Sequence, residues 1–216
     1  MLNLKTNLKR LFDERADQLR ISHPDIWAAL GYGGQVPTQQ LSVASYYAAK
    51  SVSAVASFDD MFKSDDDQSV GMTNLSKGKP EPGEVFLLCA LQVQHAAAGG
   101  AADSNVKAAA FGLISTVMRN GEIEITQKNR SIIARQSMEP FYAADNVTPV
   151  GDTNAVAGTA ITYTMTGFGN IGLVELDTPK WIYPDQKIDV LLKMSGATTA
   201  NDAVRIVLIG VKNVKL

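Results

Sequence analysis

The segment "PKWIYPDQKIDVLLKMSGATTANDAVRIVLIGVKNV", from Pro179 to Val214, contains the two clearest secondary-structure signals in this chain. "KIDVLLKM" and "AVRIVLIGV" are rich in β-branched residues, show apolar alternation and are bounded by turn residues, all of which are typical of β-strands. "YPDQ" (Tyr183–Gln186) predicts the turn that leads into the first of them. This segment therefore predicts that the chain is mainly β.

The same features recur upstream and predict eight strands in total. Between the third and fourth of them, Asn120-Gly121 predicts a two-residue hairpin turn, because both central residues of such a turn need a positive φ. Eight strands with long and uneven connections are typical of a jelly roll rather than an up-and-down barrel. The predicted strands cover residues 49–58, 83–95, 107–119, 121–127, 131–136, 170–176, 186–194 and 202–212.

The start of the chain has a different pattern, with apolar residues at the spacing of one face of an α-helix and charges of both signs between them. We expect this stripe to form the contact surface of a helical arm. It consists of Leu4, Leu8, Leu11, Phe12 and Leu19.

A second short helix is predicted in "SHPDIWAALG" (Ser22–Gly31), followed by a hinge in "GYGGQVP" (Gly31–Pro37). We therefore divide the chain into a helical N-terminal arm with a Gly-rich hinge, residues 1–39, and a jelly-roll β-sandwich, residues 40–216. The apolar stripe of the arm can pack on its own domain or on a neighbouring subunit, and both alternatives stay open. A membrane surface is a weaker candidate, since acids and bases are mixed on the polar face of the helix.

Composition and charge exclude several classes of protein. With 216 residues, 45% of them hydrophobic, the chain can bury a core. A net charge of −2 without a long Lys/Arg block argues against a dedicated nucleic-acid-binding surface. One cysteine and two histidines make a disulfide or a Cys/His zinc site untenable, so Cys89 is interpreted as a buried core thiol. No signal peptide or transmembrane run is recognisable, and we expect synthesis as a soluble protein in a reducing cytoplasm.

Glu122 and Glu124 are the strongest candidate for catalysis. Two residues apart in a strand, they share one face, at a spacing that permits a glycosidase carboxyl pair. The stretch resembles the Glu-x-Asp-x-x-Glu signature of jelly-roll β-glucanases, but Gln127 stands where the general acid is required, and a Gln cannot supply the proton. Because isoleucines alternate with the two glutamates, we interpret the pair as the solvated face of a half-buried strand.

Other candidate sites are weaker. The acidic stretch from Asp59 to Asp67 lacks the spacing of a calcium-binding loop, so a solvated loop is the default and a cation there remains an open question. His23 and His95 have no neighbouring Ser or Cys that suggests a triad. We therefore expect no catalytic residues, no metal site and no cofactor, and the chain is not expected to be an enzyme.

A charged helical arm, a hinge and an eight-stranded sandwich together resemble the single jelly-roll capsid proteins of tailless icosahedral bacteriophages. The resemblance is carried by "VGMTNLSKGKPEPGEVFLLCALQV" (Val70–Val93), "NGEIEITQKNRSIIARQSMEPF" (Asn120–Phe141) and the closing segment from Pro179 to Val214. It implies a structural shell or vertex protein, located in the virion, that self-assembles into an icosahedral particle.

The implied partners are copies of the chain and other capsid proteins, with weak contact of the arm to packaged nucleic acid or an inner membrane, and no small-molecule substrate. Two other functions compete with this one. A lectin-like or receptor-binding jelly roll would bind a sugar or surface ligand, and a degenerate β-glucanase-like glycosidase would depend on Glu122.

Overall fold

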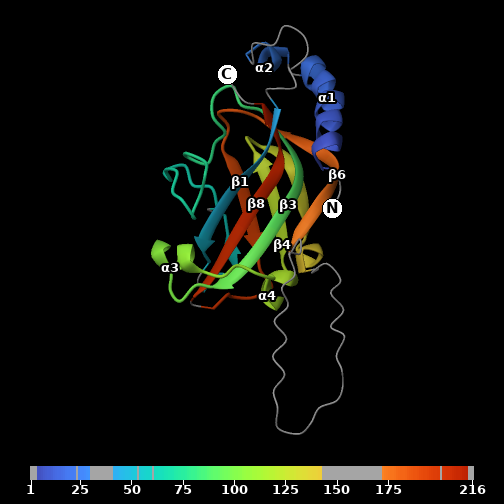
Figure 1. Ribbon diagram of the computed structural model, residues 1–216. Helices are drawn as coiled ribbons and strands as arrows, with labels where there is room; N and C mark the ends of the chain where they lie inside the picture. The colour runs from blue at the N-terminus through green and yellow to red at the C-terminus, as the bar shows by residue number, and fades with distance from the viewer. Residues whose placement is uncertain are drawn as a thin grey trace.

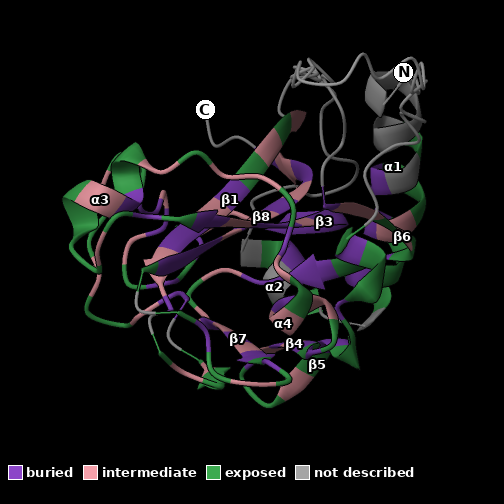
Figure 2. Cartoon of the chain, turned by 90° about the horizontal axis from the view of Figure 1, so that it is seen from below, coloured by how far each residue is buried: buried purple, intermediate pink, exposed green. Residues whose placement is uncertain are grey.

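A computed structural model describes residues 4–22, 24–29, 41–52, 54–59, 61–142, 172–199 and 201–213. The described residues form eight strands in two antiparallel four-stranded sheets, which lie as two layers (Figures 1 and 2). The prediction of a mainly β chain is therefore confirmed. The strands are β1 (Leu41–Ser51), β2 (Ser57–Phe58), β3 (Phe86–Ala97), β4 (Glu122–Gln127), β5 (Arg130–Ser137), β6 (Leu173–Ile182), β7 (Ile188–Lys193) and β8 (Asp202–Asn213).

The strand order is β1-β8-β3-β6 in the first sheet and β2-β7-β4-β5 in the second. Four pairs are nested in the sequence: β1 pairs with β8, β2 with β7, β3 with β6, and β4 with β5. Pairings of β3 with β8 and of β4 with β7 join these pairs into the two sheets. The chain thus follows one long hairpin folded over on itself, and the turn between β4 and β5 is its tip.

The turn at this tip consists of Lys128 and Asn129, whose φ angles are +47° and +63°. Gln127 pairs directly with Arg130 across it. Two positive φ values in a two-residue loop match the twist of the flanking strands. A two-residue hairpin turn is therefore present, but it joins β4 to β5. The Asn-Gly dipeptide had predicted it one strand earlier, at Asn120-Gly121.

The predicted hairpin at Asn120-Gly121 is wrong, as is the predicted strand over 107–119. The segment instead contains α3 (Asp103–Ala108) and α4 (Thr116–Arg119), and Asn120 ends α4 with a φ of −83°. Ser115 caps α4 by accepting a hydrogen bond from the Met118 N–H at 3.4 Å. Met118 of α4 and Ile114, which precedes the N-cap residue Ser115, are both buried in the core.

The remaining strand predictions fit to differing degrees. The predicted strand over 49–58 is misplaced, because β1 begins at Leu41 and β2 holds only two residues. Six other predicted strands overlap β3 to β8 apart from shifted ends. β6 continues through Pro179 to Ile182, which an edge strand tolerates because the missing N–H faces no partner strand. The second short helix is observed as α2 (Pro24–Ala29).

The main core lies between the two sheets. Phe86, Leu88 and Leu91 of β3 face Ile123 and Ile125 of β4 within one buried cluster. β3 differs from an ordinary half-buried strand because its other face is buried too, with Leu87 and Cys89 in a second cluster. A near-continuous apolar run such as "EVFLLCALQV" is typical of a strand covered on both faces.

Candidate functional site

The predicted arm helix packs on the outer face of the β1-β8-β3-β6 sheet. It is observed as α1 (Leu4–Ser22), and it runs beside β6 in Figure 1. The side chains of Phe12 and Leu19 are fully buried, and the Phe12 ring meets Trp181 edge-on at a centroid distance of 5.2 Å. Together with Ala16 of α1 and Trp27 of α2, they pack against six apolar residues in or next to the strands of this sheet, which we call the arm seat: Val85, Leu87, Cys89, Trp181, Tyr183 and Val211.

For Phe12 and Leu19, this placement corresponds to the first alternative, packing on the chain's own sheet. The side chains of Leu4, Leu8 and Leu11 lie outside the described residues. The hinge predicted at Gly31–Pro37 lies outside them as well. The signal that could have revealed the arm seat was the continuous apolar run of β3, since a strand buried on both faces requires a second covering layer.

The polar side of α1 carries ion pairs within the helix. Arg10 pairs with Glu14 at 3.5 Å and Arg20 pairs with Asp17 at 3.4 Å, in each case one helical turn apart. Arg15 donates a hydrogen bond to Gln18 at 2.9 Å. These contacts stabilise the helix itself by a few tenths of a kcal/mol each and move with it.

Two groups in the arm seat have unusual environments. The Trp181 Nε1–H is buried without a hydrogen-bond partner among the described residues. Cys89 sits at a β-bulge, where the register of β3 shifts against both β6 and β8. Burial raises the pKa of the Cys89 thiol to about 11, so the interpretation of this residue as a buried core thiol is confirmed.

Next to the arm seat, the buried side chain of Gln127 links β4 to the turn between β6 and β7. Its Nε2 donates to the carbonyl oxygens of Tyr183 at 2.9 Å and Gln186 at 3.0 Å, and its Oε1 accepts from the Tyr183 N–H at 2.9 Å. The guanidinium of Arg130 lies over the Tyr183 ring at 4.3 Å and donates to the Trp181 carbonyl. Gln127 is fully buried and holds the turn between β6 and β7.

Glu122 and Glu124 lie on the outer face of β4. Arg135 of β5 approaches both carboxylates, with its Nη2 at 3.0 Å from Glu124 and its Nε at 3.9 Å from Glu122. Glu124 also lines a shallow groove of about 360 Å³ with Asp59 and Asp189. The pair therefore forms part of a charged outer surface on this sheet.

The acidic stretch from Asp59 to Asp67 is partly neutralised by a lysine. Lys50 of β1 pairs with Asp66, and the Asp66 carbonyl accepts a hydrogen bond from the Lys77 N–H at 2.7 Å. Within the described ranges, no group of three or more His, Cys, Asp or Glu side chains is arranged to hold a metal ion. Asp60 and His23 lie outside these ranges.

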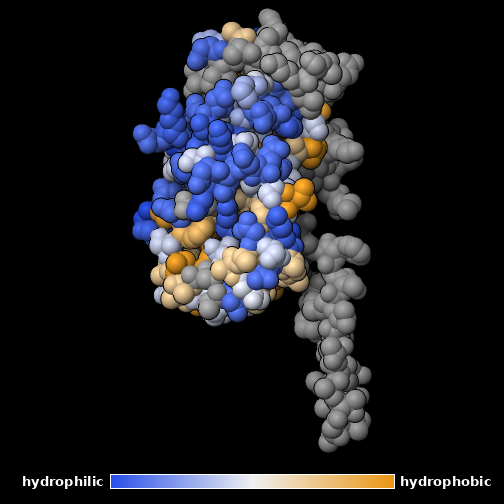
Figure 3. Space-filling view, turned by 90° about the vertical axis from the view of Figure 1, so that its left-hand side faces the viewer, coloured by the Kyte–Doolittle hydropathy of each residue, from blue (hydrophilic) through white to orange (hydrophobic). Residues whose placement is uncertain are grey.

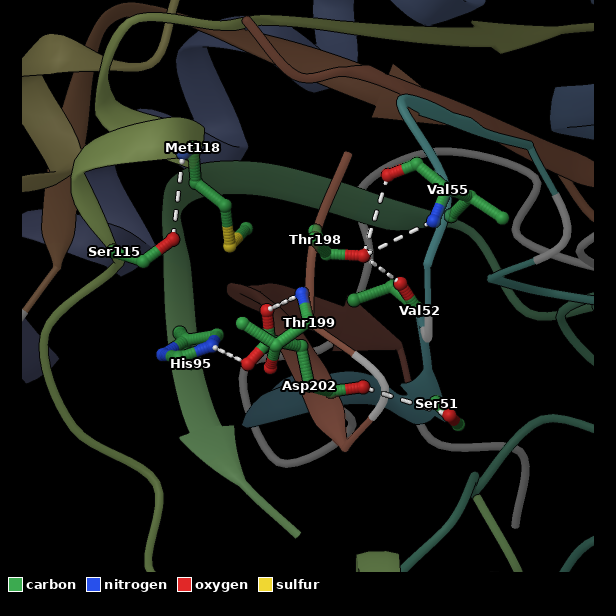
Figure 4. A network of polar contacts seen from close by, with 9 residues as sticks. All are labelled: Ser51, Val52, Val55, His95, Ser115, Met118, Thr198, Thr199 and Asp202. Atoms are coloured by element: carbon green, nitrogen blue, oxygen red, sulfur yellow. Dashed lines mark hydrogen bonds and ion pairs between the residues drawn. The ribbon is translucent and has the colours of Figure 1, made fainter. Parts of the chain in front are cut away.

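His95 has a partner that its sequence neighbourhood does not reveal. Its Nε2 lies 2.9 Å from Oδ1 of Asp202, a residue 107 positions away, and Asp202 Oδ2 accepts from the Thr199 N–H at 2.7 Å (Figure 4). Desolvation by burial raises the pKa of Asp202, but the hydrogen bonds from Thr199 and His95 lower it by more, so its pKa lies below the ordinary value. In the part of the chain that the structure describes, no hydroxyl or thiol is hydrogen-bonded to His95. We therefore interpret the His95–Asp202 contact as a structural link between the end of β3 and the start of β8.

One face of the molecule is largely polar. The face shown in Figure 3 is mostly hydrophilic, and apolar residues gather at its lower end, where α3 lies in Figure 1. A second shallow groove, of about 390 Å³, lies between β5 and β6 and is lined by Ile132, Ile133 and Leu176 among others. None of the described helices is long and apolar enough to span a membrane.

No model of a known protein family matches this chain, and no significant similarity was found to a curated protein or a solved structure.

Proposed function

We propose that this chain is a single jelly-roll structural protein that self-assembles into the closed icosahedral shell of a virus. The observation that carries the proposal is the strand order, β1-β8-β3-β6 and β2-β7-β4-β5 with nested pairs. That order results when one eight-stranded hairpin is rolled into two sheets, which is the jelly-roll arrangement used by viral capsid and lectin domains.

The packed interior supports a structural role. Apolar side chains from both sheets fill the space between them, including Phe86, Ile123 and Ile206. A jelly roll that binds a ligand inside its barrel has a cavity between its sheets. Here the apolar side chains of this cluster fill the space between the sheets. The two grooves described above lie on the outside, at β4 and β7 and between β5 and β6.

Two of the four edge strands, β5 and β6, are irregular, which disfavours open fibres built by adding strands at those edges. β5 has two register shifts against β4. In β6, Glu175 and Lys180 pair with β3, and the four residues between them, 176–179, lie opposite the single residue Cys89. Bulges and an edge proline such as Pro179 block the addition of further strands. At these two edges, contacts between copies would involve faces, loops or the arm rather than strand addition.

The partners that follow are further copies of this chain and other capsid proteins in the virion. The mixed charges on α1, with Arg10, Arg15 and Arg20 among acidic residues, suit at most weak contact with packaged nucleic acid or an inner membrane. The proposal assigns the chain no catalytic role and no small-molecule substrate.

The test is size-exclusion chromatography of the full-length protein followed by negative-stain electron microscopy, together with a glycan-binding screen and an assay on β-glucans. The expected result is closed particles of uniform diameter, no saturable sugar binding and no hydrolysis. Monomers that bind one glycan class would overturn the proposal in favour of a lectin-like module. Hydrolysis that is lost in Glu122→Gln would establish a glycosidase instead.

A further inference from the structure

We propose that the outer face of the β1-β8-β3-β6 sheet carries a binding site for a small oxyanion, a phosphate or a carboxylate group, centred on Arg205 of β8. The site lies near the start of β8 on the side of α3, whereas Val211 of the arm seat lies further along the same strand (Figure 1). It does not depend on the proposed assembly, because all the residues that carry it belong to one chain.

Arg205 lies on the outer face of this sheet, in its middle. It pairs directly with Ala49 of β1 and with Gln94 of β3, and directly opposed residues of neighbouring strands share one face. The residues on either side of it in β8, Val204 and Ile206, point inward and belong to the main core. The guanidinium therefore stands outside the sandwich, on the sheet rather than on a loop.

Two uncharged neighbours fix the direction of the guanidinium. The side chain of Gln94 is buried, with 7% of the residue exposed, and its Oε1 accepts hydrogen bonds from Nε of Arg205 at 2.8 Å and from Nη2. The guanidinium carbon lies 4.7 Å from the centroid of the Phe111 ring. These contacts orient the planar group without neutralising its charge.

The charge of Arg205 has no acidic partner among the residues that the structure describes. Gln94 uses the Nε–H and one Nη2–H, so both hydrogens of Nη1 and the second hydrogen of Nη2 remain available. Burial lowers the pKa of the Arg205 guanidinium and the nearby Tyr47 raises it, but an arginine stays protonated at neutral pH. Because a partly buried charge is costly without a counter-charge, this arrangement favours a bound anion.

Tyr47 of β1 and Lys107 of α3 add donors beside Arg205. The Tyr47 hydroxyl accepts a hydrogen bond from the Gly71 N–H at 3.3 Å, which leaves its own hydrogen to donate. A Cβ at Gly71 would lie 3.2 Å from Cγ of Lys107, so the lysine side chain passes the same glycine. Within the described ranges, Lys107 makes no ion pair. A hydroxyl donor and a second cation therefore lie on the same side of the sheet as the guanidinium.

These donors determine the chemical class of the ligand. The Nη1 and Nη2 end of a guanidinium binds two oxygens of a carboxylate or a phosphate side by side. The ammonium group of Lys107 can only donate hydrogen bonds and adds positive charge, which disfavours a cationic ligand. Phosphate and carboxylate share the chemistry that the site recognises, and competition between the two identifies the group that it prefers.

Equilibrium dialysis of the full-length protein against radiolabelled inorganic phosphate tests the site, with the ionic strength held constant by chloride. We expect saturable binding that Arg205→Gln weakens about tenfold or more, since it removes charge-assisted hydrogen bonds. Arg135→Gln is the matched control, because it removes the same charge from the outer face of the other sheet, and its binding should be unchanged. No saturable binding to the natural chain, or an equal loss in both variants, would overturn the proposal.

Gln94→Glu provides a second variant that supplies the missing counter-charge from within the chain. A carboxylate in place of the amide pairs with Arg205, so we expect a folded protein, checked by circular dichroism, that no longer binds phosphate. This variant decides the question if Arg205→Gln does not fold, and undiminished phosphate binding by folded Gln94→Glu would contradict the site. In the natural chain, displacement of labelled phosphate by acetate at comparable concentration would support a carboxylate site. Displacement by unlabelled phosphate but not by acetate would support a phosphate site.

Discussion

Asp202 joins three segments that are far apart in the sequence. Its carboxylate binds His95 of β3 and the Thr199 N–H, and its carbonyl accepts from the Val52 N–H at 2.8 Å just after β1. Thr198 reinforces the same joint, because its hydroxyl donates to the Val52 carbonyl (Figure 4). The joint therefore fixes the ends of β1, β3 and β8 relative to one another.

The lowered pKa of Asp202 predicts a specific pH dependence. A carboxyl group with a lowered pKa in the folded state adds stability above its ordinary pKa, and that stability is lost as the pH falls through the lowered value. We expect Asp202→Asn to lower the free energy of unfolding at pH 7 by about 1–3 kcal/mol. The variant should also lose less stability than the natural chain between about pH 5 and pH 2. Urea unfolding at several pH values measures both, and equal acid sensitivity of the two chains would contradict the assignment.

Gln127 provides a second prediction at this scale. Gln127→Leu leaves the Tyr183 N–H and the carbonyls of Tyr183 and Gln186 without their buried partner. We expect a loss of about 2–3 kcal/mol in the free energy of unfolding, since buried polar groups without partners are costly. The double variant Glu122→Gln and Glu124→Gln on the outer face of the same strand is the control, and should change stability by only about 0.5 kcal/mol. If both variants lost similar free energy of unfolding, the hydrogen bonds of Gln127 would not stabilise the turn between β6 and β7.

The sequence revealed some of these residues and not others. Local alternation correctly placed Glu122 and Glu124 on the outer face of a strand, and the apolar surroundings of Cys89 correctly indicated burial. The hydrogen bond between His95 and Asp202 joins residues 107 positions apart and leaves no local sequence pattern. It could be recognised only once the nested strand order was known. Of the candidate assembly arm, Phe12 and Leu19 are placed against the sheet by the structure.

At the scale of elements, the hairpin turn at Lys128 and Asn129 holds residues with positive φ that are not glycine. Changing the pair to Asn-Gly, by Lys128→Asn and Asn129→Gly, places the preferred residues at both positions. We expect the free energy of unfolding to rise by about 0.5–1 kcal/mol. Asn129→Val is the opposing variant, because a β-branched residue resists a positive φ, and it should lower stability. Thermal melting of the three chains tests the turn, and an unchanged midpoint in both variants would refute it.

The wrong prediction of a hairpin at Asn120-Gly121 shows that a local turn signal can have a tertiary cause. Asn120-Gly121 has the favoured composition of a two-residue turn, yet the Cβ of a larger residue at Gly121 would lie only 2.2 Å from the Lys193 carbonyl oxygen. The glycine there is required by the close approach of β7, a tertiary contact that no local pattern encodes. The predicted strand over 107–119 was wrong because its end forms the short capped helix α4, which buries Met118 in the core, while Ile114 is buried in the segment just before the cap.

For the whole molecule, we expect the loss of the arm helix to affect both the apolar surface that it covers and the proposed assembly. Deleting residues 1–29 removes Phe12, Ala16, Leu19 and Trp27 from the cluster and exposes the arm seat, including Cys89. We expect the truncated chain to retain its main core between the sheets, to react with thiol reagents at least tenfold faster than the full chain, and to form far fewer particles. Circular dichroism, thiol labelling and light scattering measure the three effects. A truncated chain that assembles as well as the full one would contradict a role for the arm.

Self-assembly into a closed shell is the central claim, and sedimentation velocity of the full-length protein over a range of concentrations tests it most directly. Symmetric closure predicts two boundaries, a monomer or small oligomer and one fast, narrow boundary of fixed sedimentation coefficient, whose amount but not size grows with concentration. A single monomer boundary at every concentration would contradict the account. A broad distribution that shifts continuously to larger sizes would contradict it too, since it would indicate open-ended association.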